Sequence, residues 1–102
     1  MARVVVIYKA AKDAAAFEKY YFGTHLAIAK KIPGLRKYEV SQGVVATPAG
    51  PSGSQLVATL HFDNLAAIQN AFASAEGQAA VADLQNVTTE PPQILMYESR
   101  EV

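Results

Sequence analysis

The chain has 102 residues, just over half of them apolar, which suits one domain with its own core and leaves no room for a second. Lysine plus arginine and aspartate plus glutamate number nine each, so the formal net charge is zero, and this balance argues against a nucleic-acid partner. There is no cysteine, which excludes disulfides, thiolate metal sites and cysteine nucleophiles. We therefore expect a single domain spanning residues 1–102.

The first apolar run, Val4 to Tyr8, is too short for the hydrophobic part of a signal peptide and far too short for a membrane span. The lack of cysteine is typical of proteins in a reducing compartment. These two features predict a cytoplasmic protein without a membrane partner.

The first half of the chain predicts a strand, a helix and a second strand. Residues 4–9 are β-branched and aromatic at consecutive positions, as in a central strand that is buried on both faces. Asp13 can cap a helix whose apolar residues recur every three or four positions, and Pro33-Gly34 ends that helix. Residues 35–45 alternate between apolar and polar side chains, which indicates a strand with one face in water.

The second half of the chain predicts a loop, a strand, a second helix and a last strand. Residues 47–53 form a loop by composition, and residues 56–62 form an apolar strand. Asp63 can cap a second helix that breaks near residues 74–77, and the last strand covers residues 94–97. The order strand, helix, strand, strand, helix, strand predicts an α+β ferredoxin-like fold, with a four-stranded antiparallel sheet and the helices on one face.

Residues 4–8 and 56–62 are apolar on both faces of their strands, whereas the helices of one chain can cover only one face. An uncovered apolar sheet face would be a large exposed patch. A second copy of the chain is the simplest cover, so the sequence predicts a homodimer. Two such sheets packed face to face would form a dimeric α+β barrel with an interior space.

His25 is the leading candidate for chemistry. It lies four residues after Tyr21, on the apolar side of the first predicted helix. An imidazole can serve as a general acid or base near neutral pH, here assisted by Tyr20 or Tyr21. The alternative is a structural histidine that is hydrogen-bonded at a helix edge.

The remaining candidate site residues lie on strands. His61 alternates with Val57 and Thr59 opposite an entirely apolar face, and it is therefore expected to face the barrel interior. The strand tyrosines are candidate ligand-binding residues, with core or interface packing as the alternative: Tyr8, Tyr38 and Tyr97.

Motifs for metals and cofactors are absent. The two histidines have neither HxH nor HExxH spacing, although His25 and His61 could still meet a carboxylate such as Glu39 in space. No glycine-rich phosphate loop follows the first strand, no Gly-x-Ser-x-Gly elbow occurs, and no motif indicates flavin, nicotinamide or haem. The sequence therefore predicts no metal and no cofactor.

Two segments resemble the signature of the EthD family, which is named for a protein of bacterial ethyl tert-butyl ether degradation. They are residues 17–26 (FEKYYFGTHL) and 29–35 (AKKIPGL), and residues 62–63, 74–77 (SAEG) and 82–84 (ADL) are also similar to family members. The resemblance covers nearly the whole chain and implies a dimeric α+β barrel. It also implies that His25 and Tyr21 point towards a pocket between helix and sheet. One departure is Ala27, where family members often carry proline.

Three functions remain open on this basis. The first is binding of a small hydrophobic compound in a degradation pathway, such as that of ethyl tert-butyl ether, which predicts an apolar cavity. The second is a cofactor-independent enzyme of the monooxygenase, isomerase or decarboxylase type, in which His25 transfers a proton and a tyrosine or His61 holds an oxyanion. The third is a structural dimerisation module, which predicts an interior filled by side chains.

Overall fold

The computed structural model describes residues 1–102. Four strands form an antiparallel sheet in the order β2-β5-β1-β6. The sheet strands are β1 (Ala2–Lys9), β2 (Lys37–Val40), β5 (Ser54–Phe62) and β6 (Gln93–Glu98). The helices are α1 (Ala14–Tyr20), a π-helical turn η1 (Tyr21–His25), α2 (Leu26–Ala29), α3 (Leu65–Ala73) and α4 (Ala75–Val87). The predicted ferredoxin-like α+β fold is confirmed, with the apolar strands β1 and β5 at the centre.

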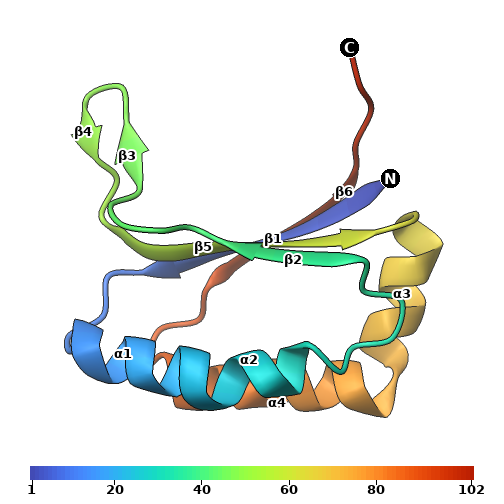
Figure 1. Cartoon of the computed structure of the whole chain (residues 1–102), viewed down its shortest axis with the longest axis horizontal. Helices are drawn as coiled ribbons and strands as arrows, with labels where there is room; N and C mark the ends of the chain where they lie inside the picture. Colours follow the sequence, from blue (N-terminus) through green and yellow to red (C-terminus); the bar gives the residue numbers. More distant parts are fainter.

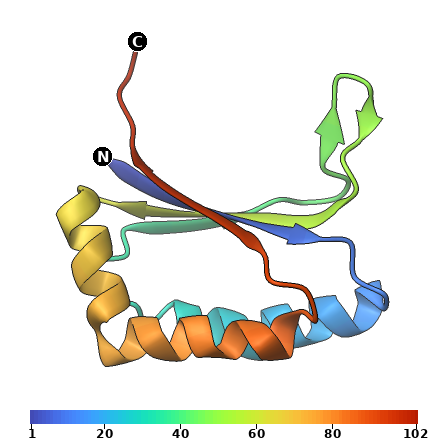
Figure 2. The ribbon, with the colours of Figure 1, turned by 180° about the vertical axis from the view of Figure 1, so that it is seen from behind.

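The molecule has two layers (Figure 1). Helices α1, α2 and α4 lie side by side against one face of the sheet, and α3 connects the end of the sheet to that layer. A small hairpin of β3 (Ala46–Thr47) and β4 (Gly50–Pro51) rises from the opposite side of the sheet, as does the C-terminal tail (Figure 2). None of the helices combines the length and the hydropathy that a membrane crossing requires.

The core lies between the sheet and the helices. Directly paired residues of antiparallel strands share one face, and the pairs Val4–Leu60 and Tyr8–Leu56 both face the helices. Every second residue of the two central strands is buried there: Ala2, Val4, Val6, Tyr8, Leu56, Ala58, Leu60 and Phe62. The residues between them point to the other face, which no element of the chain covers.

The first helical segment is continuous from α1 through η1 to α2. Asp13 caps it as expected, because its side chain accepts a hydrogen bond from the Ala16 backbone nitrogen at 3.0 Å. Buried residues recur at intervals of four: Phe17, Tyr21, His25 and Ala29. In a regular α-helix, each step of four residues turns about 40° beyond a full circle. The wider π turn offsets this drift, so the four side chains stay on the sheet-facing side.

Strand β2 is shorter than the predicted strand over residues 35–45. The Ser41 backbone nitrogen still donates a hydrogen bond to the Val57 carbonyl. The Val57 backbone nitrogen, however, donates to the hydroxyl of Ser41 rather than to a backbone carbonyl of the neighbouring strand. Gly43 follows with a φ of 76°, a conformation that glycine adopts readily, and the chain leaves the sheet.

The cap of α3 also differs from the prediction. Asn64, and not Asp63, accepts the hydrogen bond from the Ala67 backbone nitrogen. Asp63 instead forms a two-point ion pair with Arg36, whose Nη2 lies 2.8 Å from Oδ2. The carboxylate of Asp63 therefore binds Arg36 instead of capping the helix, and the side-chain oxygen of Asn64 caps it in its place.

The predicted break at residues 74–77 is present. Ser74 ends α3 and caps α4 by accepting a hydrogen bond from the Gly77 backbone nitrogen. Gly77 is buried, and a Cβ at this position would collide with the Ala71 carbonyl group and with the backbone of Phe72. The tight corner between α3 and α4 therefore needs glycine for close approach rather than for an unusual φ.

We expect Gly77→Ala to lower the free energy of unfolding by about 1–3 kcal/mol, since the backbone must shift to admit the methyl group. Gly23→Ala is the matched control, because a Cβ there meets no atom within 4 Å and alanine favours a helix by up to ~1 kcal/mol. Urea unfolding of both variants measures the difference. Equal stabilities would show that the corner tolerates a side chain.

Candidate functional site

A cavity of about 40 Å³ lies between the sheet and the helices. Its wall is apolar except for His25, Tyr8 and Tyr38. The cavity has room for roughly three water molecules, given the 10–15 Å³ that each requires on this measure. Its exposed side is formed by Val81 of α4 and Ile94 of β6, with exposed fractions of 47% and 38%. The cavity therefore opens towards the surface between these two elements.

His25 is held by a carboxylate from another helix. Its side chain is 4% exposed, and Nδ1 lies 2.8 Å from Oδ2 of Asp83 on α4, which is 8% exposed. The side chain of His25 is directed towards the cavity even though Ala27 stands where family members often have proline.

Asp83 has two further hydrogen-bond donors. The Tyr20 hydroxyl donates to Oδ1 at 2.6 Å, and Nδ2 of Asn86 donates to the same atom at 3.1 Å. Burial raises the pKa of Asp83, but the hydrogen bonds from Tyr20, Asn86 and His25 together outweigh burial, so the pKa lies below its ordinary value. Asp83 is therefore a carboxylate at neutral pH, and it can only accept hydrogen bonds.

This partner fixes the tautomer of the neutral His25 ring. Because Asp83 accepts, Nδ1 carries the hydrogen and Nε2 carries the lone pair. Nε2 has no hydrogen-bond partner. Every side-chain nitrogen or oxygen that is completely covered does have one, so Nε2 must be partly uncovered and must border open space. His25 lines the cavity, and its geometry is that of a base whose free nitrogen is available to a bound molecule.

Two tyrosines, Tyr8 and Tyr38, line the same cavity. The Tyr21 and Tyr38 hydroxyl oxygens lie 2.6 Å apart, but of these two only Tyr38 lines the cavity, and Tyr21 is completely buried. If Tyr21 accepted this hydrogen bond, its own hydrogen would have no partner. Tyr21 therefore donates, and the hydroxyl hydrogen of Tyr38 is left for another acceptor.

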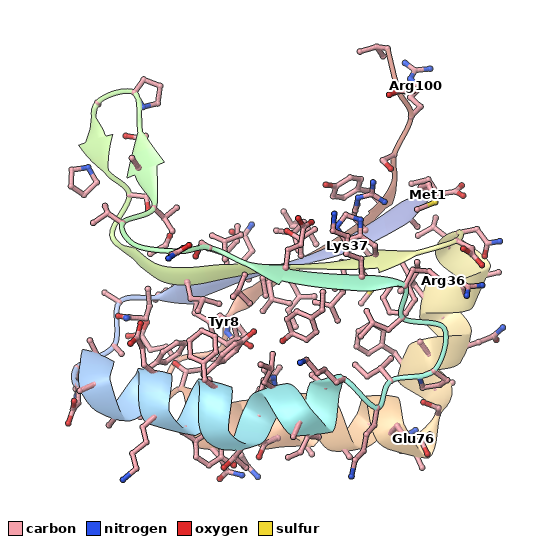
Figure 3. The ribbon with its side chains drawn as sticks, in the orientation of Figure 1. Met1, Tyr8, Arg36, Lys37, Glu76 and Arg100 are labelled. Atoms are coloured by element: carbon pink, nitrogen blue, oxygen red, sulfur yellow. The ribbon has the colours of Figure 1, made fainter.

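Tyr8 projects from β1 into the space between the sheet and the helices (Figure 3). Its ring packs edge-on against Phe17 and Tyr21, with centroid distances of 5.4 and 5.6 Å. Its hydroxyl makes no hydrogen bond within the chain, and Tyr8 lines the cavity. Burial, followed by the neighbouring Tyr38 and Asp83, raises the pKa of Tyr8, so its hydroxyl remains a donor at neutral pH.

Two of the predicted site residues lie on the opposite face of the sheet. His61 donates from Nε2 to Glu39 at 2.6 Å, and this bond outweighs partial burial in lowering the pKa of Glu39. Lys37, which Figure 3 shows on the same face, lies 3.6 Å from Glu39. Tyr97 also occupies this face, since it pairs with Arg3 in the register that places Arg3 opposite His61.

The sheet therefore divides the predicted residues into two sets. On the helix-covered side lie Tyr8, Tyr21, His25 and Tyr38. The Tyr20 hydroxyl donates a hydrogen bond to Asp83, the partner of His25. His61 and Tyr97 do not join them. The alternative in which His25, His61 and Glu39 share a ligand is wrong, because the sheet lies between the two histidines. No group of three or more histidine, aspartate or glutamate side chains is arranged to hold a metal ion.

Sequence reasoning did not identify Asp83 and Asn86 as site residues. A signal was present, because Asp83 falls three residues after Ala80 and four before Val87, at helical spacing from two apolar residues that the structure buries on α4. A carboxylate at such a position needs a buried partner. The spacing alone could not show that this partner is His25, which is 58 residues away along the chain.

A wider hollow of about 580 Å³ runs along the outside between α2 and α4. It is lined by charged residues of both signs, Lys31 and Glu76, and also by Asp83 and Asn86. Figure 3 shows Glu76 near the start of α4, on the side of the helices away from the sheet. We place the candidate site in the smaller cavity, because a histidine with an unpaired ring nitrogen lies there in a mainly apolar lining.

Asp83 predicts a specific pH dependence of stability. Its folded-state pKa lies below the unfolded value of about 3.9, so its contribution is present above about pH 4 and is lost as the pH falls through the folded value. We expect Asp83→Asn to lower the free energy of unfolding by about 1–3 kcal/mol at pH 7, and to lose this disadvantage below about pH 4. Urea unfolding between pH 2 and 7 measures this.

Asp63→Asn is the control, because Asp63 also has a lowered pKa but belongs to an exposed pair with Arg36, whose contribution to stability is small since solvent screens it. A constant difference between wild type and Asp83→Asn at every pH would show that the carboxylate charge of Asp83 is not responsible.

Known proteins resemble this chain in sequence and in structure. The family model described as the EthD domain matches residues 9–89. An uncharacterized 11.0 kDa protein from the thcB-thcC intergenic region of Rhodococcus erythropolis is 33% identical over 86 residues, which covers 84% of this chain and 82% of that protein. The crystal structure of an EthD family protein from Bacillus halodurans is 29% identical and covers 98% of this chain and 99% of its own, with a TM-score of 0.89.

More distant structures share the fold alone. A cofactor-independent oxygenase, SnoaB from Streptomyces nogalater, is 16% identical with a TM-score of 0.67, and covers 99% of this chain and 94% of its own. A dimeric protein of unknown function and ferredoxin-like fold from Bacteroides fragilis is 22% identical with a TM-score of 0.64, and covers 96% and 95%. The family model covers most of the chain, and it identifies the chain: it belongs to the EthD family.

Proposed function

We propose that this protein binds a small, mainly apolar molecule in the cavity beside His25 and that His25 acts on it as a general base. One observation carries the proposal. Nδ1 of His25 is held at 2.8 Å by the buried carboxylate of Asp83, while Nε2 is unpaired and His25 lines a cavity whose other residues, apart from Tyr8 and Tyr38, are apolar. A histidine that served only packing or capping would have no need of a free nitrogen on an enclosed space.

The surroundings of His25 favour proton transfer over simple binding. The Asp83 carboxylate stabilises the imidazolium that forms when Nε2 takes a proton, and it keeps the ring oriented. The hydrogen bonds from Tyr20 and Asn86 lower the basicity of Asp83, so the carboxylate supports the ring without removing its proton. The apolar wall limits water and strengthens these electrostatic interactions.

The family supports a role for this activity in the breakdown of a hydrophobic compound. EthD denotes ethyl tert-butyl ether degradation, and the distant neighbour SnoaB is a cofactor-independent oxygenase on the same fold. We therefore propose a cytoplasmic protein, folded as one domain over residues 1–102, in such a pathway. The cavity beside His25, with an unpaired ring nitrogen, favours a ligand site over a purely structural dimerisation module.

A substitution that fills the cavity tests ligand binding. Ala80 lines the cavity and is 5% exposed, so we expect Ala80→Val to weaken binding of toluene or cyclohexanone by at least about tenfold, through lost volume. Titrations followed by backbone amide NMR shifts measure the affinity and locate the probe.

Ala79→Val is the matched control, because Ala79 is the neighbouring exposed residue of α4 and lies outside the cavity. Wild-type protein whose pocket residues show no shift with any apolar probe would contradict the proposed function.

We propose further that the chain forms a homodimer through the uncovered face of its sheet. That face carries Val5, Val57 and Thr59 on the central strands and the exposed side chains of Leu95 and Tyr97 on β6. Apolar area of this kind is stabilised when a second layer covers it. The hairpin and the C-terminal tail rise on the same side, where both would flank a second copy.

Val57→Asp tests the dimer. The charge would be buried in the interface without a partner, so we expect the variant to become monomeric or to unfold. Analytical ultracentrifugation gives the mass, and circular dichroism reports whether the monomer is folded. The control, Gln69→Asp, places the same charge on the exposed side of α3. A folded dimer of Val57→Asp would show that the subunits do not meet through this face.

A further inference from the structure

We propose that the cavity selects a molecule with a neutral oxygen as its head group, either a ketone carbonyl or a phenol hydroxyl. The oxygen points at the hydroxyls of Tyr8 and Tyr38 and becomes an oxyanion when His25 removes one proton from the bound molecule. This inference rests on the proposed function and names the substrate class of the same site.

The charge of the lining restricts the ligand to neutral molecules. No lysine, arginine, aspartate or glutamate lines the cavity, and Asp83 contacts His25 from outside it. A carboxylate, phosphate or ammonium group in the cavity would lose its water without gaining an opposite charge. The ligand therefore enters uncharged, and negative charge develops only after binding.

The hydrogen-bond inventory then selects oxygen as the head atom. Tyr38 receives the hydrogen of Tyr21 and retains its own, and the Tyr8 hydroxyl has no partner in the chain. The cavity thus offers two neutral hydroxyl donors from the strands and one acceptor, Nε2 of His25, from the helix. Donors set apart from a base suit an oxygen that gains negative charge as the base takes a proton.

The size of the cavity indicates how the molecule lies. A space of about 40 Å³ admits only a small head group. The remainder of a larger molecule would extend towards the surface past Val81, Leu84 and Ile94, which are apolar. The ligand is accordingly a compound with one buried oxygen and an apolar body at the mouth of the cavity.

The chemical step needs no other reactant. For a ketone, the proton on the α carbon moves to Nε2 of His25, and the electrons of the broken C–H bond shift through the carbon framework to the carbonyl oxygen, giving an enolate. For a phenol, the O–H proton moves to Nε2 and the electron pair stays on oxygen. If the proton on Nε2 exchanges with solvent before a proton returns to the same carbon, the result is isotope exchange of the ketone, and return of the proton to a conjugated carbon gives isomerisation.

The first experiment compares phenol with toluene, two molecules of similar shape in which a hydroxyl replaces a methyl group. Amide NMR titrations give both affinities for the wild type and for Tyr8→Phe, Tyr38→Phe and the control Tyr97→Phe, which lies on the opposite face of the sheet. We expect wild type and the control to bind phenol about tenfold more tightly than toluene, and we expect the Tyr8 and Tyr38 variants to lose most of that preference.

The second experiment follows deuterium incorporation into cyclohexanone in D₂O by NMR. We expect wild-type protein to accelerate α-proton exchange above the buffer rate, and we expect His25→Gln to abolish the acceleration while still binding toluene. Acceleration assigns the ketone as the head group. A phenol preference without acceleration assigns the phenol.

Toluene binding as tightly as phenol, together with no exchange, would overturn the oxygen head group and leave the proposed binding site intact. Binding of none of the three probes would overturn both proposals. Circular dichroism of each variant checks its folding. Should Tyr38→Phe fail to fold because it leaves the buried Tyr21 hydroxyl without its acceptor, Tyr8→Phe still decides the matter, because the Tyr8 hydroxyl has no hydrogen-bond partner in the chain to lose.

Discussion

The hydrogen bond between His25 and Asp83 determines how the site is built, because it joins the two helical segments that lie beside each other against the sheet. Both groups are buried, so without Asp83 the Nδ1 of His25 would be left unpaired, and without His25 the Asp83 Oδ2 would lose its hydrogen bond. Tyr20 and Asn86 complete the hydrogen bonding of the carboxylate from the outer side. One nitrogen of the ring is thereby fixed by the helices, and the other is left to the cavity.

The sheet assigns different roles to its two faces. The side chains of β1 and β5 that face the helices build the core and, through Tyr8, part of the cavity wall. The alternate side chains, including Val5, Val57 and His61, lie on a face that the chain itself does not cover. A period of two along each strand produces this separation, so a candidate residue's face follows from its position along the strand.

The π turn is the local feature that makes the arrangement of Tyr21 and His25 possible. A regular helix would rotate successive residues at intervals of four away from the sheet, whereas the wider turn keeps Phe17, Tyr21, His25 and Ala29 on one side. Gly23 lies within this turn, and a Cβ at this position would meet no atom within 4 Å, so close packing does not require glycine there.

The sequence by itself determined the order of the elements, the antiparallel ferredoxin-like sheet and the candidacy of His25, because strand alternation, helical spacing and caps are local patterns. The tertiary structure decided which candidates meet. His25 and Asp83 are separated by 58 residues, and only the packing of α4 beside the first helical segment brings them within 2.8 Å. The same is true of Asp63, whose local capping role gave way to Arg36. Contacts of this kind depend on how elements pack, and no spacing along the chain encodes them directly.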